Sequence, residues 1–160
     1  MPEQTSTEII STVTSEGNVE ISIARVEKPT LSENEALIKV DASPINPSDL
    51  GLLISFAADL DSLSVSVSGD NTVAKMKIHP GLMGAMKPRL DESMQVGNEG
   101  GGVVVDAGAN AKHLIGKTVG VAGGAMYSQY RCVSAQSCLV MEEGTTPAEA
   151  SSSFVNPLTA

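Results

Sequence analysis

The chain has 160 residues, of which 19 are acidic and 10 are basic, so its formal net charge is −9. This length suits one domain, and with only four aromatic residues the core must consist of Val, Ile, Leu, Ala and Met. The acidic balance disfavours nucleic-acid and anionic membrane partners, since both need clustered Lys and Arg, and no apolar run approaches the roughly 20 residues that span a bilayer.

The first half of the chain predicts two strands and a short helix. Val19, Ile21 and Ile23 alternate with small or polar residues, which is typical of a half-buried strand, and residues 35–42 predict a second strand. Asn46 is followed by Pro and then by an acidic residue, a pattern typical of a helix start. The next predictions are a loop or insertion over 55–72, which is rich in Ser, Asp and Ala, and a short strand over 73–78.

The second half predicts more strands. Residues 79–81 break the chain, and a short helix should follow and end before Pro88. Residues 97–106 form a Gly-rich entry into an apolar strand, and Thr146 begins a helix with a capping box. The other predicted strands cover 116–122, 126–133 and 137–141. We therefore expect a mainly β fold, a partly open barrel with short helices.

The N-terminus and the cysteines bear on cellular location. Residues 1–10 have no basic segment followed by an apolar one, so they do not form a secretory signal. Cys132 and Cys138 fit buried thiols of a reducing compartment better than a disulfide scaffold. We expect a cytoplasmic protein.

Four segments, taken in order, resemble the N-terminal GroES-like domain of the medium-chain dehydrogenase/reductase superfamily. They are 46–49 (NPSD), 97–108 (GNEGGGVVVDAG), 116–120 (GKTVG) and 154–160 (FVNPLTA). Their order and spacing are similar to those of the zinc-free quinone oxidoreductase branch and the related enoyl thioester reductases. The resemblance covers roughly residues 30–160, and 55–90 look like a bacterial subgroup of that branch.

The resemblance implies the substrate-side domain of a zinc-independent, NAD(P)H-dependent oxidoreductase that reduces quinones or activated alkenes such as enones. Residues 1–150 would form the GroES-like catalytic domain, and 151–160 would begin the helix that leads towards a Rossmann domain. The 160 residues contain no strand–GxGxxG–helix fingerprint. We therefore expect the Rossmann domain, with most of the NADPH site, to be absent from this chain, and the isolated chain to be inactive.

A zinc site is disfavoured. Zinc-dependent relatives carry a Cys where this sequence has Asn46 and a His where it has Asn98, and amides are poor zinc ligands. Glu99 keeps the carboxylate of the family pattern, but a single carboxylate does not make a site. We expect no metal.

Asn46 carries two interpretations. Helix capping explains it without any function, whereas the resemblance implies that its amide faces the interdomain cleft and hydrogen-bonds cofactor or substrate. By the same resemblance Asn156 and Thr159 would lie beside the nicotinamide, while their alternative is a frayed terminal helix.

Tyr127 and Tyr130 are the candidate proton donors to a reduced carbonyl or alkene, with core packing as the alternative. On one strand they would point to opposite faces, so at most one could face a cleft. Enoyl thioester reductases use a Tyr shortly after their NPSD-like segment. Here residues 50–60 contain no Tyr, and their one aromatic residue is Phe56, which argues against thioester reduction.

Three further patterns have alternatives. The glycines at 97 and 100–102 are followed by a strand rather than a helix, which favours close backbone packing over a phosphate loop. Met76, Met83, Met86 and Met94 would line an apolar surface or fill the core. The alternative to an enzyme domain is a non-catalytic binding or assembly module, in which a homodimer covers an exposed apolar face.

Overall fold

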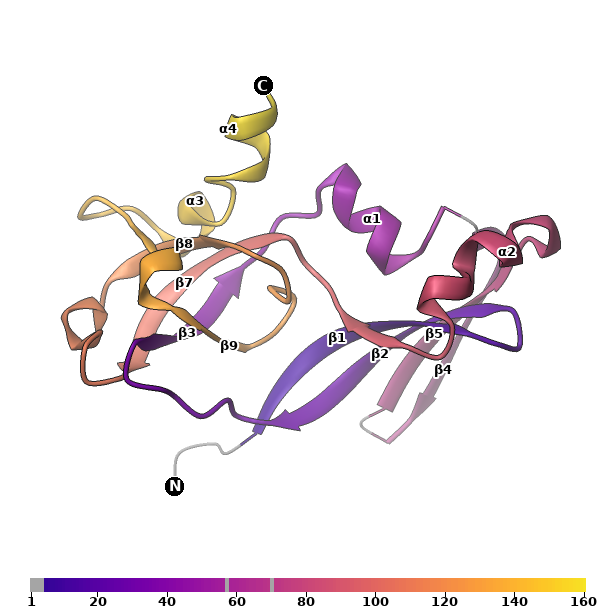
Figure 1. Ribbon diagram of the computed structural model, residues 1–160, viewed down its shortest axis with the longest axis horizontal. Coiled ribbons are helices and arrows are strands. Elements are labelled where there is room, and N and C mark those ends of the chain that lie inside the picture. Colours follow the sequence, from indigo (N-terminus) through magenta and orange to yellow (C-terminus); the bar gives the residue numbers. More distant parts are fainter. Residues whose placement is uncertain (1–4, 57, 70) are drawn as a thin grey trace.

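The computed structural model describes residues 5–56, 58–69 and 71–160, and nearly half of the chain forms two five-stranded antiparallel sheets (Figure 1). One sheet has the order β4-β5-β2-β1-β6 and the other β10-β8-β7-β3-β9. The strands are β1 (Thr5–Thr14), β2 (Asn18–Glu27), β3 (Glu35–Ala42), β4 (Ala58–Ser68), β5 (Asn71–Ile78), β6 (Ser93–Gln95), β7 (Glu99–Ala107), β8 (Thr118–Ala122), β9 (Tyr130–Ser134) and β10 (Leu139–Val140).

The helices are short and lie at the ends of strands. The α-helices are α1 (Pro47–Leu53), α2 (Met83–Met86), α3 (Pro147–Ala150) and α4 (Val155–Thr159). The described residues also form four short 3-10 helices: Pro80–Leu82, Lys87–Arg89, Lys112–Leu114 and Ala135–Ser137. No helix in the described part of the chain is long and apolar enough to cross a membrane.

Each sheet has its own hydrophobic core. In the β1-containing sheet, Val13 and Val19 face each other across the β1–β2 hairpin and are fully buried. The core of this sheet consists of Val13, Val19, Met76, Ile78 and Met86. The core of the β3-containing sheet consists of Ala36, Ile38, Val104, Ala107, Ala111, Leu114, Val119, Val121 and Met126.

The glycines of β7 allow close packing, as predicted. A side chain at Gly101 would overlap the carbonyl oxygen of Pro147 in α3, and one at Gly102 would overlap that of Lys39 in β3. Glycine is therefore needed because two backbone segments approach β7 too closely for a Cβ atom.

Residues 125–129 join the two sheets. The Val40 N–H of β3 donates to the Gln129 carbonyl at 3.0 Å, and the Gln129 N–H donates to the Thr7 carbonyl of β1 at 2.9 Å. The Ile9 N–H of β1 donates to the Tyr127 carbonyl at 2.9 Å. This segment therefore hydrogen-bonds to one strand of each sheet.

The predicted mainly β fold with short helices is confirmed, and two separate antiparallel sheets are consistent with a partly open barrel. The predicted strand over 35–42 and the helix starts at Pro47 and Pro147 are also confirmed. The methionine stretch is largely core filling, since Met76 and Met86 are buried and Met83 packs against them.

Three predictions were wrong. The loop predicted over 55–72 is wrong for most of its described residues, because Ala58–Ser68 form β4 and this strand pairs with β5; residues 57 and 70 lie outside the described part of the chain. Residues 126–129 are not in a strand, because their hydrogen bonds run to two different sheets, and β10 covers only two residues of the stretch 137–141. In addition, the sequence patterns do not predict β1, which pairs with β2 over ten residues.

Candidate functional site

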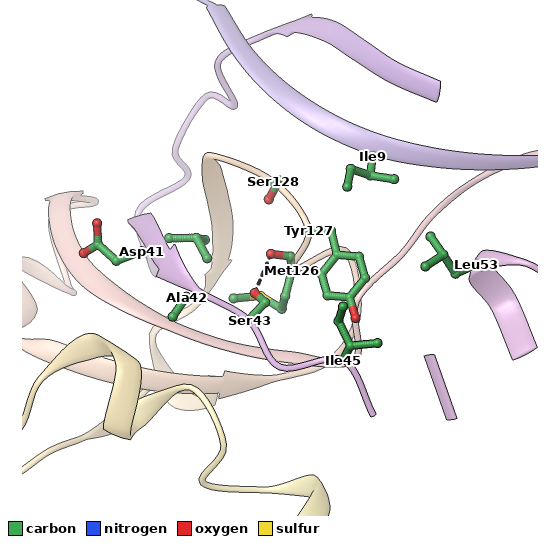
Figure 2. Close-up of a pocket in the computed structure, with 10 residues that line it drawn as sticks. Ile9, Asp41, Ala42, Ser43, Ile45, Leu53, Met126, Tyr127 and Ser128 are labelled. Atoms are coloured by element: carbon green, nitrogen blue, oxygen red, sulfur yellow. Dashed lines mark hydrogen bonds between the residues drawn. The ribbon is translucent and has the colours of Figure 1, made fainter. Parts of the chain in front are cut away.

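A pocket of about 370 Å³ opens where the two sheets meet. Figure 2 shows the Tyr127 ring among the side chains of Ile9, Ile45 and Leu53. The lining residues come from β1, β3, the segment before α1, the end of α1 and the joining segment: Ile9, Val40, Asp41, Ala42, Ser43, Ile45, Leu53, Met126, Tyr127 and Ser128. Most of these side chains are apolar, so the pocket favours an apolar ligand.

Two hydrogen bonds to backbone carbonyls and one close approach of two backbone segments hold the pocket wall that carries Tyr127. The Ser43 hydroxyl donates to the Met126 carbonyl at 2.8 Å, a bond drawn in Figure 2, and the Tyr127 hydroxyl donates to the Pro44 carbonyl at 3.0 Å. Gly97 has a φ of +96°, and a Cβ atom there would lie 2.6 Å from the Tyr127 backbone nitrogen. The glycine therefore lets the Tyr127 segment lie directly against the entry to β7.

A buried carboxylate lies at the start of β7. Glu99 is 0% exposed, and its Oε1 accepts a hydrogen bond from the Asn46 amide at 3.0 Å. Its Oε2 accepts the backbone N–H groups of Phe154 and Val155 at 2.9 and 3.0 Å. Glu99 thus joins the residue before α1 to the first turn of α4, where a negative charge is favoured.

A second buried carboxylate, Asp49, fixes the start of α1. Its Oδ2 accepts the Asn46 backbone N–H at 2.8 Å, and its Oδ1 accepts the Asn98 backbone N–H at 2.8 Å. Asp49 is 0% exposed. Asn46 is therefore held through its backbone by Asp49 and through its side chain by Glu99.

The Tyr127 phenol is a weak acid. Burial raises its pKa to about 12, and the negative charge of Asp49 contributes to the increase. The phenol therefore stays protonated at neutral pH. It can donate a hydrogen bond to a ligand oxygen but gives up its proton reluctantly.

The predicted site residues divide into three places. Asn46 is only 2% exposed and does not line the pocket itself, although the preceding residue, Ile45, does. Tyr127 lines the pocket, whereas Tyr130 lies in β9 with the Lys28 ammonium 3.6 Å from its ring centre.

Asn156 and Thr159 are exposed on α4, which projects from the body of the molecule (Figure 1). The Thr159 hydroxyl donates to the Val155 carbonyl within the same helix at 2.8 Å. Neither residue lines the pocket.

Two features of this site were missed from sequence. The lining residues Ile9, Leu53 and Met126 were not predicted, because nothing local indicates that their segments meet. The role of Glu99 was also missed, although a carboxylate next to a glycine run and a buried strand is itself a signal: a buried charge needs several donors.

Metal ligands do not gather in this region. Within residues 5–56, 58–69 and 71–160 there is no group of three or more His, Cys, Asp or Glu that could hold a metal ion. The Asn98 side chain donates to the Ser48 hydroxyl at 2.9 Å, and that of Asn46 donates to Glu99. Cys132 and Cys138 are free thiols; both are half-buried, whereas the sequence predicted buried thiols.

The fold is similar to that of several solved proteins. A candidate NADPH:quinone reductase from Bacillus thuringiensis is 23% identical with a TM-score of 0.65, and the match covers 98% of this chain and 39% of that one. A candidate NADPH:quinone reductase from Mesorhizobium loti is 20% identical with a TM-score of 0.61, and the match covers 99% of this chain and 43% of that one. An Etr1p mutant solved in complex with NADP and crotonyl-CoA is 16% identical with a TM-score of 0.59, covering 96% of this chain and 41% of that one.

These likenesses show a shared fold. The chain spans about two fifths of the length of each of these neighbours. No family model matches the sequence, and a search of curated proteins finds no match.

Proposed function

We propose that this chain is the substrate-side domain of a zinc-independent, NAD(P)H-dependent oxidoreductase that reduces quinones or enones. The observation that carries the proposal is the apolar pocket with the Tyr127 hydroxyl in its wall, in a fold shared with NADPH:quinone reductases. Residues 1–150 would form this domain and 151–160 would lead into a Rossmann domain. The chain alone would be inactive, since the sequence has no dinucleotide fingerprint.

The pocket residues would hold and orient the substrate. A nicotinamide cofactor, when bound, supplies a hydride. The apolar lining would exclude water from a quinone or enone, and the Tyr127 hydroxyl would turn from the Pro44 carbonyl towards the oxygen on which negative charge develops. Tyr130 was an equal candidate from sequence, but its place under Lys28 favours packing.

The residues proposed for the cofactor are Asn46, Asn156 and Thr159. Asn156 and Thr159 are exposed, so their side chains fit a role in binding a polar group. Asn46 would contribute less directly, because its exposed fraction is 2% and one of its amide N–H groups is bonded to Glu99. Zinc independence is supported by Asn46 and Asn98, which stand where zinc-dependent relatives carry the stronger ligands Cys and His.

Ligand binding by the 160-residue chain tests the pocket. We would titrate isotope-labelled chain with 1,4-naphthoquinone and follow the NMR signals of Ile9, Met126 and Tyr127. The expected result is that these signals shift, that Ala42→Phe abolishes the shifts by filling the pocket, and that the control Tyr130→Phe keeps them. Shifts that survive Ala42→Phe would overturn the assignment.

Two further observations test the proposed domain organisation. Mixing the chain with NADPH and a quinone should give no protein-dependent loss of the nicotinamide absorbance, and saturable turnover would contradict it. Sequencing the source gene beyond the codon for Ala160 should reveal an open frame of about 150–200 residues, the length of a further domain, with a strand, a glycine fingerprint and a helix. An immediate native stop codon would favour the binding or assembly module instead.

A group of exposed apolar side chains supports the second candidate function, a non-catalytic binding or assembly module. Apolar side chains are exposed on α1, on its flanks and on α4: Ile45, Leu50, Phe56 and Leu158. Either a following domain or a partner protein would cover them. Sedimentation at two concentrations tests this: assembly that Leu158→Lys abolishes would support the assembling module, and assembly that it leaves unchanged would not.

A further inference from the structure

Strand β4 forms an unpaired edge of its sheet. It is the outer strand in the order β4-β5-β2-β1-β6 and pairs only with β5 among the described residues. Over Ser64–Ser68 the pairing with β5 is continuous, and no other strand of the described residues pairs with the opposite side of this backbone stretch. Such an edge is a template for another strand.

The side chains of β4 are unusually apolar for an exposed edge. Val65 is 61% exposed and Val67 is 70% exposed, and Leu60 and Leu63 are also more than half exposed. Val65 and Val67 alternate with serines in the regularly paired stretch 64–68, so they lie on one face. Soluble proteins usually protect an edge with charged residues, proline or a bulge. The pairing of β4 is irregular between Asp59 and Ser64, but residues 64–68 are regularly paired and contain no charged residue and no proline.

The sequence of β4 is complementary to itself. In an antiparallel pair with a two-fold axis at Val65, Val65 faces Val65 of the other copy and Ser64 faces Ser66. Residues 64–68 contain no acidic residue, so no two carboxylates oppose each other in this stretch. This matters because a chain of net charge −9 repels its own copies, and residues 62–68 are a stretch where two copies can meet without adding to that repulsion.

We propose that β4 pairs antiparallel with β4 of a second copy of this chain, forming a symmetric dimer with a continuous ten-stranded sheet. The β4 edge and α4 lie well apart in Figure 1, so this contact leaves α4 and its exposed residues free. A single added strand buries little surface, and small interfaces are weak. The dimer is therefore reversible and depends on concentration.

The test is analytical sedimentation of the full chain from about 1 µM to 1 mM, the range in which small interfaces associate. The wild-type chain should change from monomer to dimer. Val65→Lys should raise the dissociation constant at least about tenfold, because the two-fold axis brings the two introduced ammonium groups together. The matched control Leu158→Lys, also at an exposed apolar residue, should leave it unchanged, and thermal unfolding checks that both variants fold.

A covalent readout fixes the position of the axis. In Val65→Cys the two introduced thiols would be opposite each other and should form a disulfide on mild oxidation, located by peptide mapping; Leu158→Cys should not. A wild-type chain that stays monomeric at about 1 mM would overturn the proposal. So would a dimer that Leu158→Lys breaks and Val65→Lys does not, which would place the contact on α4.

Discussion

At the scale of single residues, Glu99 is the central polar group of the candidate site. Its two carboxylate oxygens accept three N–H groups from Asn46, Phe154 and Val155, which are 53 to 56 positions away in the sequence. All three partners are donors, so the position needs a group that only accepts. A carboxylate meets this requirement and an amide does not.

Glu99→Gln should therefore destabilise the protein by about 1–3 kcal/mol, because the new NH₂ group would face another donor and leave buried groups unpaired. Denaturant unfolding measures the loss. Hydrogen exchange at the Phe154 and Val155 amides should accelerate more than exchange in β2. Glu143→Gln, at an exposed position, is the matched control and should change stability by less than about 0.5 kcal/mol. Equal effects of the two variants would contradict the role of Glu99.

Tyr127 gives a pH-dependent prediction. Its pKa is raised by folding from 10.0 to about 12, so the stability it contributes is complete below about pH 10 and is lost as the pH rises towards 12. Tyr127→Phe has no such group, so the stability difference between wild type and variant should shrink over this range. Unfolding at several alkaline pH values measures the difference, and absorbance titration should show a phenol with a pKa near 12 that the variant lacks. A constant stability difference would refute this coupling.

At the scale of elements, close packing of backbone decides where glycine is required. Helix α3 lies against β7 so tightly that a Cβ atom at Gly101 would overlap the Pro147 carbonyl, whereas a Cβ atom at Gly51 in α1 would have no neighbour within 4 Å. Glycine is thus required for close packing in β7 but not in α1.

Gly101→Ala should destabilise by about 1–3 kcal/mol, because the α3 backbone must shift. Gly51→Ala should stabilise by up to about 1 kcal/mol, because alanine favours a helix. Chemical denaturation of both variants under the same conditions tests the pair, and a neutral Gly101→Ala would show that α3 is free to move.

The errors of sequence interpretation also lie at this scale. Residues 55–72 are rich in Ser, Asp and Ala, a composition that predicts a loop, although the alternating Ser and Val over 64–68 have the period of a strand. Residues 126–129 have apolar and aromatic residues typical of a strand, yet their hydrogen bonds lead to β1, β3 and the segment before β7. Local composition could not indicate that these residues would join two sheets.

At the scale of the whole molecule, residues 125–129 connect the two sheets and so the two cores. The core around Val13 and Met76 belongs to one sheet and the core around Ile38 belongs to the other. Residues 125–129 hydrogen-bond to a strand of each sheet. The candidate pocket lies at this junction, so its shape depends on both sheets keeping their relative positions.

Met76→Ala and Ile38→Ala should each cost about 2–5 kcal/mol and should both lower the midpoint of one cooperative transition, because the sheets share their joining segment. Differential scanning calorimetry at matched protein concentration tests this. Two separate transitions, each sensitive to only one of the substitutions, would show that the sheets unfold independently.

The sequence by itself determined the mainly β class, the strand over 35–42, the Gly-rich β7 and the helix starts at Pro47 and Pro147. These features depend on side-chain alternation, backbone sterics and capping, which act between residues a few positions apart. Only the tertiary structure decided that Tyr127 lies in a pocket, that Glu99 binds Asn46 and the start of α4, and that β4 is an exposed edge. The physical reason is that burial and hydrogen-bond partners are set when distant segments pack together, and no local pattern records which segments will meet.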